Sequence, residues 1–344
     1  MALYEIAAIA IAVILIHNKG LRALLLVSVA GLICAYNSRS AIACWRLLMG
    51  LVVIEAIAQT FQAKDLKRLF TCWRIITIIH TGYMLLYQAI GLDPLFAQAG
   101  GGAITVAGLM DSNALAGAYT AMTLPLFFEK RYAWFILPSL LAVALSASFG
   151  AVVIAVVMLA WGAFLFLRPK RLCAALLAGL LLFVVGYSHK IEPVRAKIKG
   201  EKLNRIIAWE HCFMLMNENW RTRLIGQGPG QFLIAFRRES KISPELGVLG
   251  TMPWGVAHNE PLQAAVEFGA ITASVCLLTA RDWIVQALKT PDERFKRIGL
   301  IASGWVMCSF YYFPAHVVCL AVVFIVCAGI MESGRISRDL NVLA

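Results

Sequence analysis

Apolar runs separated by a few charged or turn-forming residues fill most of this chain. Hydrophobic residues make up 60% of its 344 residues, charged residues only 15%, and the mean hydropathy is +0.77. A water-soluble domain does not have this balance, whereas a lipid bilayer accommodates it. The sequence therefore predicts an all-α polytopic membrane protein, with residues 1–344 forming a single integral membrane domain.

Eleven runs, within a range of ten to twelve, are expected to be membrane-spanning helices, although several are near the short end for a span. They cover residues 2–17, 21–36, 40–61, 66–90, 112–128, 132–147, 149–167, 171–187, 259–280, 297–313 and 315–331. The first run is expected to be a retained span, since it contains Glu5 and no small-residue cleavage site follows it.

Lysine and arginine gather in alternate connections between these runs, among them residues 64–68, 130–131 and 281–297. Such connections are expected on the cytoplasmic side of a membrane. The pattern predicts that the first residue lies outside and the last residue inside.

One long segment, residues 188–257, interrupts the apolar pattern and is expected to be an external loop between two spans. It carries eleven Lys or Arg residues and six Glu residues, which gives a net charge of +5. A cationic surface beside a membrane attracts either an anionic substrate or anionic lipid headgroups, and the sequence leaves both open.

Within this loop, residues 203–216 have the pattern of an amphipathic helix. One stripe holds four large apolar side chains, those of Ile206, Trp209, Phe213 and Met216. The helix is expected either to lie at the membrane interface, with Arg205 beside a lipid-linked phosphate, or to pack against the rest of the loop.

A glycine-rich stretch, residues 226–232, follows this helix with the sequence Gly-Gln-Gly-Pro-Gly-Gln-Phe. Glycine permits positive φ and close approach of the backbone to a neighbour or an anion. The stretch lacks the Lys-Ser/Thr pair of a nucleotide-binding P-loop, so it does not indicate nucleotide binding.

The next span is expected to begin near His258, with Asn259 as a helix cap and a proline in the first turn. Asn259, Gln263 and Glu267 recur every four residues and would form a polar stripe on one helix face. A carboxylate at membrane depth indicates either a functional site or a hydrogen-bond network between helices.

Three other features have structural interpretations. Glu55 and Arg74, in consecutive spans, are expected to form a buried ion pair. Asn113 is expected to cap the span that it begins or to line a cavity. The nine cysteines include no C-x-x-C pair and are expected to be packing residues, so neither a disulfide framework nor a metal site is predicted.

These motifs in their order resemble the O-antigen ligase/polymerase superfamily of bacterial envelope glycosyltransferases. The resemblance covers roughly residues 105–275 and depends on the stretches GLMDSNALA, SASFGA, RIIAW, GQGPGQF and HNEPLQAAVEFG. It implies a GT-C-like fold in the bacterial inner membrane, with an active site on the periplasmic side. The distribution of Lys and Arg described above predicts a cytoplasmic C-terminus.

The resemblance also implies a reaction and a set of partners. A metal-independent, inverting enzyme would transfer a glycan from an undecaprenyl-diphosphate carrier to lipid A core or to another saccharide, among membrane lipids. No cofactor and no nucleic acid are expected. O-antigen polymerase activity is an alternative within the superfamily. A lipid-linked oligosaccharide transporter and a non-catalytic homologue are alternatives of other classes.

Site roles follow from the same resemblance. His258 matches the histidine regarded as catalytic, and Arg205 matches an arginine assigned to diphosphate binding. By residue chemistry, Glu267 or Glu260 is expected to orient His258. Further substrate contacts are expected from Arg221, Arg223, Asn259, Gln263 and Asn113. The chain departs from the superfamily pattern at Phe149, where an arginine is common, and Arg39, Arg46, Arg221 or Arg223 would have to replace it.

Overall fold

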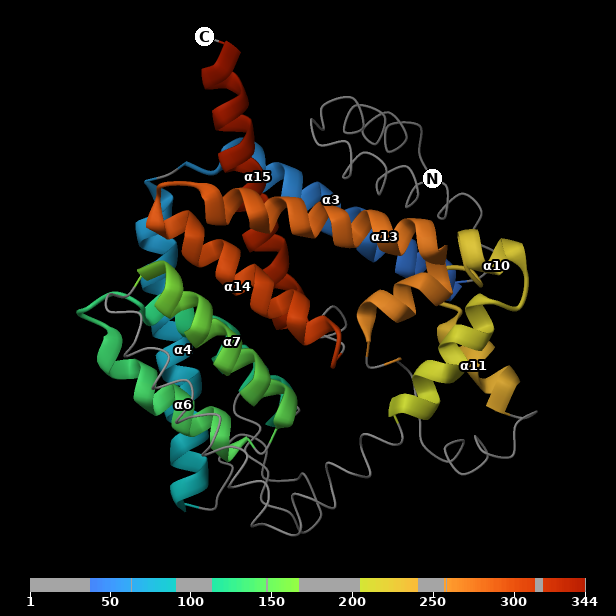
Figure 1. The fold of residues 1–344 in the computed structure, drawn as a ribbon, viewed down its shortest axis with the longest axis horizontal. Helices are drawn as coiled ribbons and strands as arrows, with labels where there is room; N and C mark the ends of the chain where they lie inside the picture. The colour runs from blue at the N-terminus through green and yellow to red at the C-terminus, as the bar shows by residue number, and fades with distance from the viewer. Residues whose placement is uncertain are drawn as a thin grey trace. The chain divides into compact units, whose positions relative to one another are not determined.

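A computed structural model of the chain describes residues 38–62, 64–90, 113–146, 148–166, 205–240, 257, 259–312 and 318–343. Every regular element in these ranges is a helix, which confirms the all-α prediction for them (Figure 1). The predicted spans 2–17, 21–36 and 171–187 lie outside the described residues. The chain divides into two compact units, described separately below.

The first unit comprises residues 1–61, 200–289 and 309–344. Its described helices are α3 (Ser38–Thr60), the helix at 205–216, α10 (Trp220–Ile225), α11 (Phe232–Ser240), α13 (Glu260–Lys289) and α15 (Val318–Leu343). α15 packs closely on α3, because the missing side chain of Gly329 leaves room for Ile57. Trp283 Nε1 donates to Glu332 Oε2 at 2.7 Å and joins α13 to α15.

The second unit comprises residues 62–199 and 290–308. Its helices are α4 (Asp65–Ile90), α5 (Asn113–Thr123), η1 (Leu124–Phe127), η2 (Ala133–Phe135), α6 (Ile136–Leu145), α7 (Phe149–Phe166) and most of α14 (Glu293–Ser309). α5 is almost entirely buried and packs against α6 and α7. Pro125 has no N–H to continue the α-helical ladder, and α5 tightens into the 3-10 helix η1 there.

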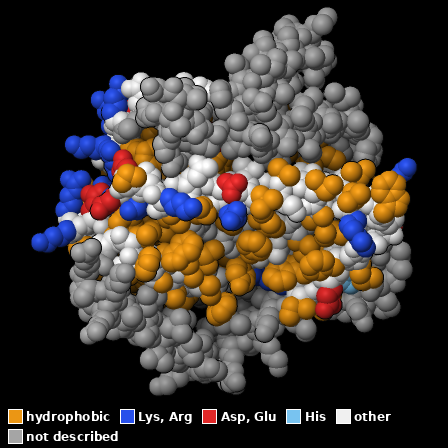
Figure 2. Space-filling view, turned by 45° about the horizontal axis from the view of Figure 1, so that its top comes forward, with side chains coloured by type: hydrophobic (Ala, Val, Ile, Leu, Met, Phe, Trp, Pro, Cys, Tyr) orange, Lys and Arg blue, Asp and Glu red, His pale blue; other side chains and the backbone are white. Residues whose placement is uncertain are grey.

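Among the described residues, four helices are long and apolar enough to cross a membrane: Ala41–Thr60, Asp65–Leu86, Phe149–Phe166 and Glu260–Lys289. Three shorter apolar helices cover Ala114–Phe127, Ala133–Leu145 and Leu320–Gly334. On the face shown in Figure 2, much of the described surface is hydrophobic, as lipid contact requires. The membrane-helix character is therefore confirmed, while the number of eleven spans stays a prediction.

Two predicted spans continue as helix well beyond their predicted ends. The span predicted at 259–280 continues as helix to Lys289, and the one predicted at 315–331 continues to Leu343. Charges such as Arg281 and Asp282, both exposed, end the apolar run without ending the helix. Hydropathy marks the border of the lipid layer, whereas helix ends depend on caps and backbone hydrogen bonds.

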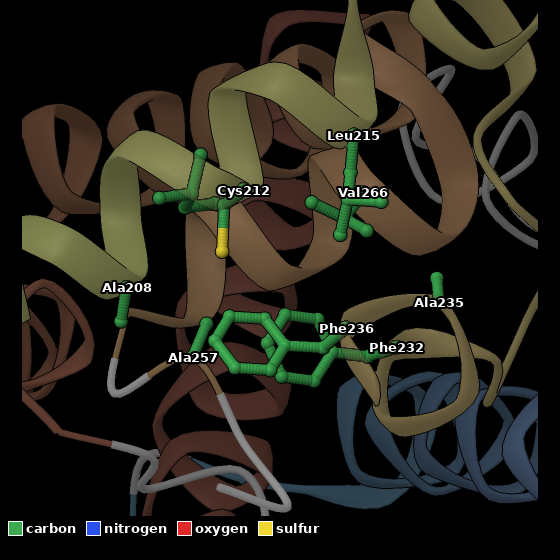
Figure 3. Packing of buried hydrophobic residues seen from close by; sticks show 9 residues of the cluster. Ala208, Cys212, Leu215, Phe232, Ala235, Phe236, Ala257 and Val266 are labelled. Atoms are coloured by element: carbon green, nitrogen blue, oxygen red, sulfur yellow. The ribbon is translucent and has the colours of Figure 1, made fainter. Parts of the chain in front are cut away.

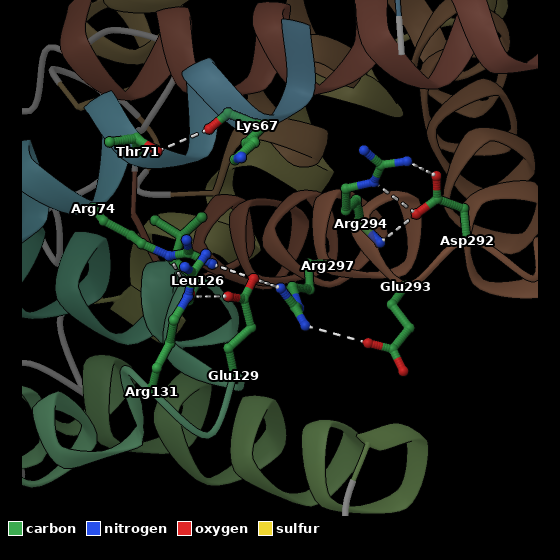
Figure 4. A network of polar contacts seen from close by, with 10 residues as sticks. All are labelled: Lys67, Thr71, Arg74, Leu126, Glu129, Arg131, Asp292, Glu293, Arg294 and Arg297. Carbon is green, nitrogen blue, oxygen red and sulfur yellow. Dashed lines mark hydrogen bonds and ion pairs between the residues drawn. The ribbon is translucent and has the colours of Figure 1, made fainter. Parts of the chain in front are cut away.

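The predicted pairing of Arg74 with Glu55 is wrong. Arg74 donates instead to Glu129, with Nη2 2.5 Å from Oε1, and to the carbonyl of Leu126 at 2.8 Å (Figure 4). Arg297, from α14, donates to the same carboxylate oxygen. The sequence misled because Glu129 follows η1, in a connection whose neighbours in space the apolar pattern does not reveal.

The Glu129 cluster joins α4, the turn after η1 and α14 within the second unit. Arg74 and Arg297 are buried, and the exposed Arg131 donates to the other carboxylate oxygen of Glu129 at 3.1 Å. Burial tends to raise the pKa of Glu129, but the hydrogen bonds and charges of Arg74 and Arg297 outweigh it and hold that pKa below its usual value. The cluster therefore fixes three segments of the unit through one ionised carboxylate.

Candidate functional site

The helix at residues 205–216, predicted as amphipathic, packs on the start of α13 and on α11. Its buried face includes Ala208, Cys212 and Leu215, which belong to one buried cluster with Phe232 and Phe236 of α11 (Figure 3). Small residues on this face let the two rings approach, and the rings stack with centroids 5.5 Å apart.

The predicted stripe on this helix is only partly correct. Trp209 and Met216 pack against the buried cluster, but Ile206 and Phe213 are exposed. The large apolar residues suggested the wrong face because the small residues that permit close packing carry little hydrophobic signal. The packing alternative is therefore supported, and Ile206 and Phe213 leave an exposed apolar surface on the other face.

Both sequence neighbours of His258 are fixed by hydrogen bonds, although His258 itself lies outside the described residues. Trp209 Nε1 donates to the carbonyl of Ala257 at 3.1 Å, and Ala257 N–H donates to Gln263 Oε1 at 2.9 Å. Asn259 Oδ1 accepts from Leu262 N–H at 3.0 Å, which confirms it as the cap of α13. The backbone on each side of the candidate catalytic histidine is thus held by the helix at 205–216 and by α13.

α13 is interrupted at Gly269, which has φ 84° and ψ 163°. The break leaves backbone carbonyls without their helical partners, and the glycine-rich stretch supplies new ones. Gln227 N–H donates to Val266 O at 2.7 Å, and Gly228 N–H donates to Glu267 O at 3.0 Å. The close approach predicted for this stretch is confirmed, and the partner is the backbone of α13.

The side chain of Glu267 also joins α13 to the glycine-rich stretch. Its Oε2 accepts from Gly230 N–H at 2.9 Å, and its Oε1 accepts from Gln263 Nε2 at 3.3 Å. Both Gln263 and Glu267 are buried. The predicted polar stripe therefore exists as a hydrogen-bond network that runs from Ala257 to the glycine-rich stretch.

Arg205 lies at the start of the described part of its helix and is half-buried. Its Nη1 donates to the carbonyl of Tyr311 at 2.9 Å, and its guanidinium lies 5.4 Å from the ring centroid of Tyr312. The helix at 205–216 is thereby joined to the turn after α14. This contact gives the guanidinium a fixed position on the same helix as Trp209.

Arg221 and Arg223 are exposed on α10. α10 begins with a capping box, in which Asn219 Oδ1 accepts from Thr222 N–H at 3.0 Å and Thr222 Oγ1 accepts from Asn219 N–H at 3.1 Å. The Arg221 guanidinium lies 5.5 Å from the ring centroid of Trp220. α10 ends at Gly226, beside the break in α13, so its two arginines are attached to the same network.

The remaining predicted site residues lie on four different helices. Glu260 begins α13 and is half-buried. Asn113 is the first residue of α5, and its side chain lies outside the described residues. Phe149 begins α7 with an exposed ring, and Arg46 is exposed on α3.

Two contributors to the site were not predicted from the sequence. Gly269 interrupts α13, and Gln227 donates from its side chain to Leu215 O at 3.0 Å and to Glu218 at 2.8 Å. The sequence signal at the break is a single glycine inside an apolar run, which is equally compatible with an unbroken helix.

Residues 134–277 match the family model described as O-antigen ligase. This part of the chain is similar to the O-antigen ligase family. The O-antigen ligase region extends from η2 into α13 and includes Arg205, the glycine-rich stretch and the break at Gly269. The resemblance to the O-antigen ligase/polymerase superfamily is therefore confirmed. A comparison with curated proteins finds no match.

Proposed function

We propose that this protein is a membrane glycosyltransferase of the O-antigen ligase type. It transfers a glycan from undecaprenyl diphosphate to lipid A core, or to another saccharide acceptor, at the periplasmic face of the bacterial inner membrane. The observation that carries the proposal is that the O-antigen ligase region contains the network joining α10, the glycine-rich stretch and the start of α13.

In the proposed reaction an acceptor hydroxyl attacks the anomeric carbon of the donor sugar. The new glycosidic C–O bond forms as the bond between that carbon and the diphosphate oxygen breaks. The hydroxyl proton passes to the His258 imidazole, which acts as general base. Undecaprenyl diphosphate leaves with the bonding electron pair, and a single displacement inverts the anomeric centre.

Arginine side chains are assigned the task of stabilising the departing diphosphate. A guanidinium presents a planar fork of N–H donors that suits phosphate oxygens, and it stays charged throughout the reaction. Arg205, Arg221 and Arg223 lie on the two helices that adjoin the start and the break of α13. No metal ion is needed in this scheme, because guanidinium groups provide the compensating charge.

Glu267 is assigned a positioning role. Its two oxygens accept hydrogen bonds from Gly230 and Gln263, so it supports the glycine-rich stretch and, through Gln263, Ala257 beside His258. Glu260 remains the candidate for orienting the imidazole. Asn259 acts on the site through the helix cap, and Asn113 remains a candidate acceptor contact.

Purified protein reconstituted in proteoliposomes tests this function directly. The donor is an undecaprenyl-diphosphate-linked glycan, and the acceptor is either lipid A core or a second carrier-linked repeat unit. Glycan on lipid A core indicates a ligase, whereas longer glycan on the carrier indicates a polymerase. Movement of the unmodified donor across the bilayer with neither product would indicate a transporter and overturn the proposal.

A break in a membrane helix is also typical of secondary transporters, where unwound carbonyls coordinate ions. In α13 the carbonyls of Val266 and Glu267 already accept hydrogen bonds from the glycine-rich stretch. This arrangement favours a structural role for the break over an ion site, and it supports the transferase over the transporter.

A further inference from the structure

Three arginines of the second unit share the single carboxylate of Glu129. Its Oε1 accepts from the buried Arg74 and Arg297, and its Oε2 accepts from the exposed Arg131 at 3.1 Å (Figure 4). Arg297 also pairs with Glu293 at 3.4 Å, but the Glu293 side chain is 67% exposed and its charge is screened by water and salt. The cluster therefore carries more positive than negative charge.

One buried donor in this cluster has no acceptor. Arg297 is 3% exposed, and its Nε makes no hydrogen bond within the part of the chain that the structure describes. A buried N–H without an acceptor costs about 1–3 kcal/mol. The shortage of acceptor oxygens and the excess of positive charge indicate the same kind of partner, an anion.

The chain around Glu129 presents two cations to the outside. Tyr132 N–H donates to Glu129 O at 2.8 Å, which closes a turn with Lys130 and Arg131 at its centre. Both of these side chains are exposed. Together they offer phosphate oxygens the planar fork of a guanidinium and the point charge of an ammonium.

Helix lengths place this turn at a border of the lipid layer. α7 rises about 26 Å at about 1.5 Å per residue and so nearly crosses the hydrocarbon layer, which is about 30 Å thick. The ring of Phe166, the last residue of α7, lies 5.4 Å from the guanidinium of Arg297, which is in the first turns of α14. The cluster is therefore at the end of the spans and not in their middle. The distribution of Lys and Arg predicts that this end is cytoplasmic.

An exposed apolar flank adjoins the turn. Phe135 of η2 packs on Phe127 of η1 with ring centroids 4.7 Å apart, so η2 lies beside the turn that follows η1. Trp134 of η2 is 65% exposed, and Leu137 at the start of α6 is 75% exposed. Tryptophan is enriched at headgroup level, and an exposed leucine further along the chain into a span suits an acyl chain.

We propose that the turn Glu129–Tyr132 and its apolar flank bind one anionic phospholipid from the leaflet on that side of the membrane. Lys130 and Arg131 bind the headgroup phosphate, while Trp134 and Leu137 contact the first part of an acyl chain. When Arg131 turns to the phosphate, Oε2 of Glu129 becomes available to the buried guanidinium groups. The inference does not depend on the proposed catalytic activity.

Native mass spectrometry of the detergent-solubilised full chain tests this lipid site. Phosphatidylglycerol and phosphatidylcholine are titrated separately, and inorganic phosphate is then added in large excess as a competitor. We expect the first phosphatidylglycerol to bind at least five-fold more tightly than phosphatidylcholine. Lys130→Gln/Arg131→Gln should weaken its binding at least five-fold, and inorganic phosphate should leave it bound.

Arg281→Gln/Lys289→Gln is the matched control, because it removes the same charge from two exposed positions of α13. It should change the affinity for phosphatidylglycerol less than two-fold. Equal affinities in wild type and Lys130→Gln/Arg131→Gln, or an equal loss in the control, would overturn the proposal. Displacement by inorganic phosphate would also overturn it, since the site would then bind a free anion.

Photo-crosslinking in nanodiscs of phosphatidylglycerol and phosphatidylethanolamine examines the acyl chain. The photoreactive residue p-benzoylphenylalanine replaces Leu137 or, as a control, Ile271, which is exposed on α13. At Leu137 the ratio of phosphatidylglycerol to phosphatidylethanolamine adducts should fall at least two-fold when Lys130→Gln/Arg131→Gln is introduced, and at Ile271 it should not change. An unchanged ratio at Leu137 would overturn the assignment of this flank to the bound lipid.

Discussion

The backbones of Gly226 and Gly269 are in direct contact, and both residues have positive φ, 81° and 84°. A Cβ on Gly226 would lie 2.4 Å from the carbonyl of Glu267, and one on Gly269 would lie 2.0 Å from Leu224 O. This contact joins α10 to the middle of α13. Glycine is required at both positions for conformation and for space.

Alanine at either glycine is expected to destabilise the protein strongly. Gly226→Ala and Gly269→Ala each combine a strained positive φ with a clash against backbone, and we expect a loss of at least about 2 kcal/mol in unfolding free energy. Thermal unfolding of detergent-solubilised protein, followed by size-exclusion chromatography, measures the effect.

Gly82→Ala is the matched control for this pair, because nothing lies within 4 Å of a Cβ at Gly82 in α4. Alanine there should leave stability unchanged or raise it by up to about 1 kcal/mol, since alanine favours helix. If Gly226→Ala unfolded at the same temperature as Gly82→Ala, the proposed contact would not exist.

Glu267→Gln is expected to loosen the glycine-rich stretch while preserving side-chain size. The amide oxygen of Gln still accepts one of the two hydrogen bonds, but its amide nitrogen faces the other donor, either Gly230 N–H or Gln263 Nε2. A donor that faces a donor costs about 1–3 kcal/mol. Hydrogen exchange of the peptide covering residues 226–232 should accelerate, while a peptide from α3 stays unchanged. Glu210→Gln, at an exposed position, is the control, and equal exchange in the two variants would argue against the network.

The apolar runs predicted most described helices, because burial in lipid leaves a long and unambiguous hydropathy signal. Asn259 as a cap and the close approach of residues 226–232 were also predictable, since both follow from local side-chain and backbone chemistry. The break at Gly269 was not, because one glycine within an apolar run is compatible with an unbroken helix.

Long-range partners were harder to predict than local structure. The pairing of Arg74 with Glu129 depends on how α4 and η1 pack, and residue spacing does not encode it. The buried face of the helix at 205–216 was missed because Ala208 and Cys212 contribute fit instead of hydrophobicity. Those features depend on the shape of the surrounding helices, which a single sequence does not display.

Glu129→Gln is expected to lower the unfolding free energy by about 3 kcal/mol at neutral pH, because it leaves the buried Arg74 and Arg297 without their shared carboxylate. The folded-state pKa of Glu129 is lowered, so its stabilisation is full above the ordinary glutamate pKa and declines as pH falls through the folded-state pKa. The difference in unfolding temperature between wild type and Glu129→Gln should therefore shrink in strong acid.

Arg131→Gln is the control for the Glu129 variant. Arg131 donates to the same carboxylate but is exposed, so its loss should cost less than about 1 kcal/mol. Burial raises the pKa of Asp292, but hydrogen bonds from Arg294 outweigh it and lower that pKa. Asp292 titrates in wild type and in Glu129→Gln alike, so its contribution cancels when their unfolding temperatures are compared. A difference between wild type and Glu129→Gln that did not change with pH would contradict an ionised Glu129.

Arg205→Lys is expected to reduce glycan transfer at least ten-fold although the charge is kept. Lysine cannot present the planar fork for the diphosphate, and it cannot reproduce the contacts with Tyr311 and Tyr312. Initial rates are measured against donor concentration, which shows whether donor binding is weakened. The unfolding temperature is measured in parallel, which shows whether the variant is less stable. Arg68→Lys, at an exposed position of α4, should retain activity, and wild-type rates in Arg205→Lys would remove its assigned role.

The most direct test of the proposed function compares wild type with His258→Ala in proteoliposomes that contain carrier-linked glycan and saccharide acceptor. We predict that wild type forms the glycan product and releases undecaprenyl diphosphate, while His258→Ala, at an unchanged unfolding temperature, forms product at least a hundred-fold more slowly. Product formation by His258→Ala at the wild-type rate, or its absence with wild type and both acceptors, would contradict the account.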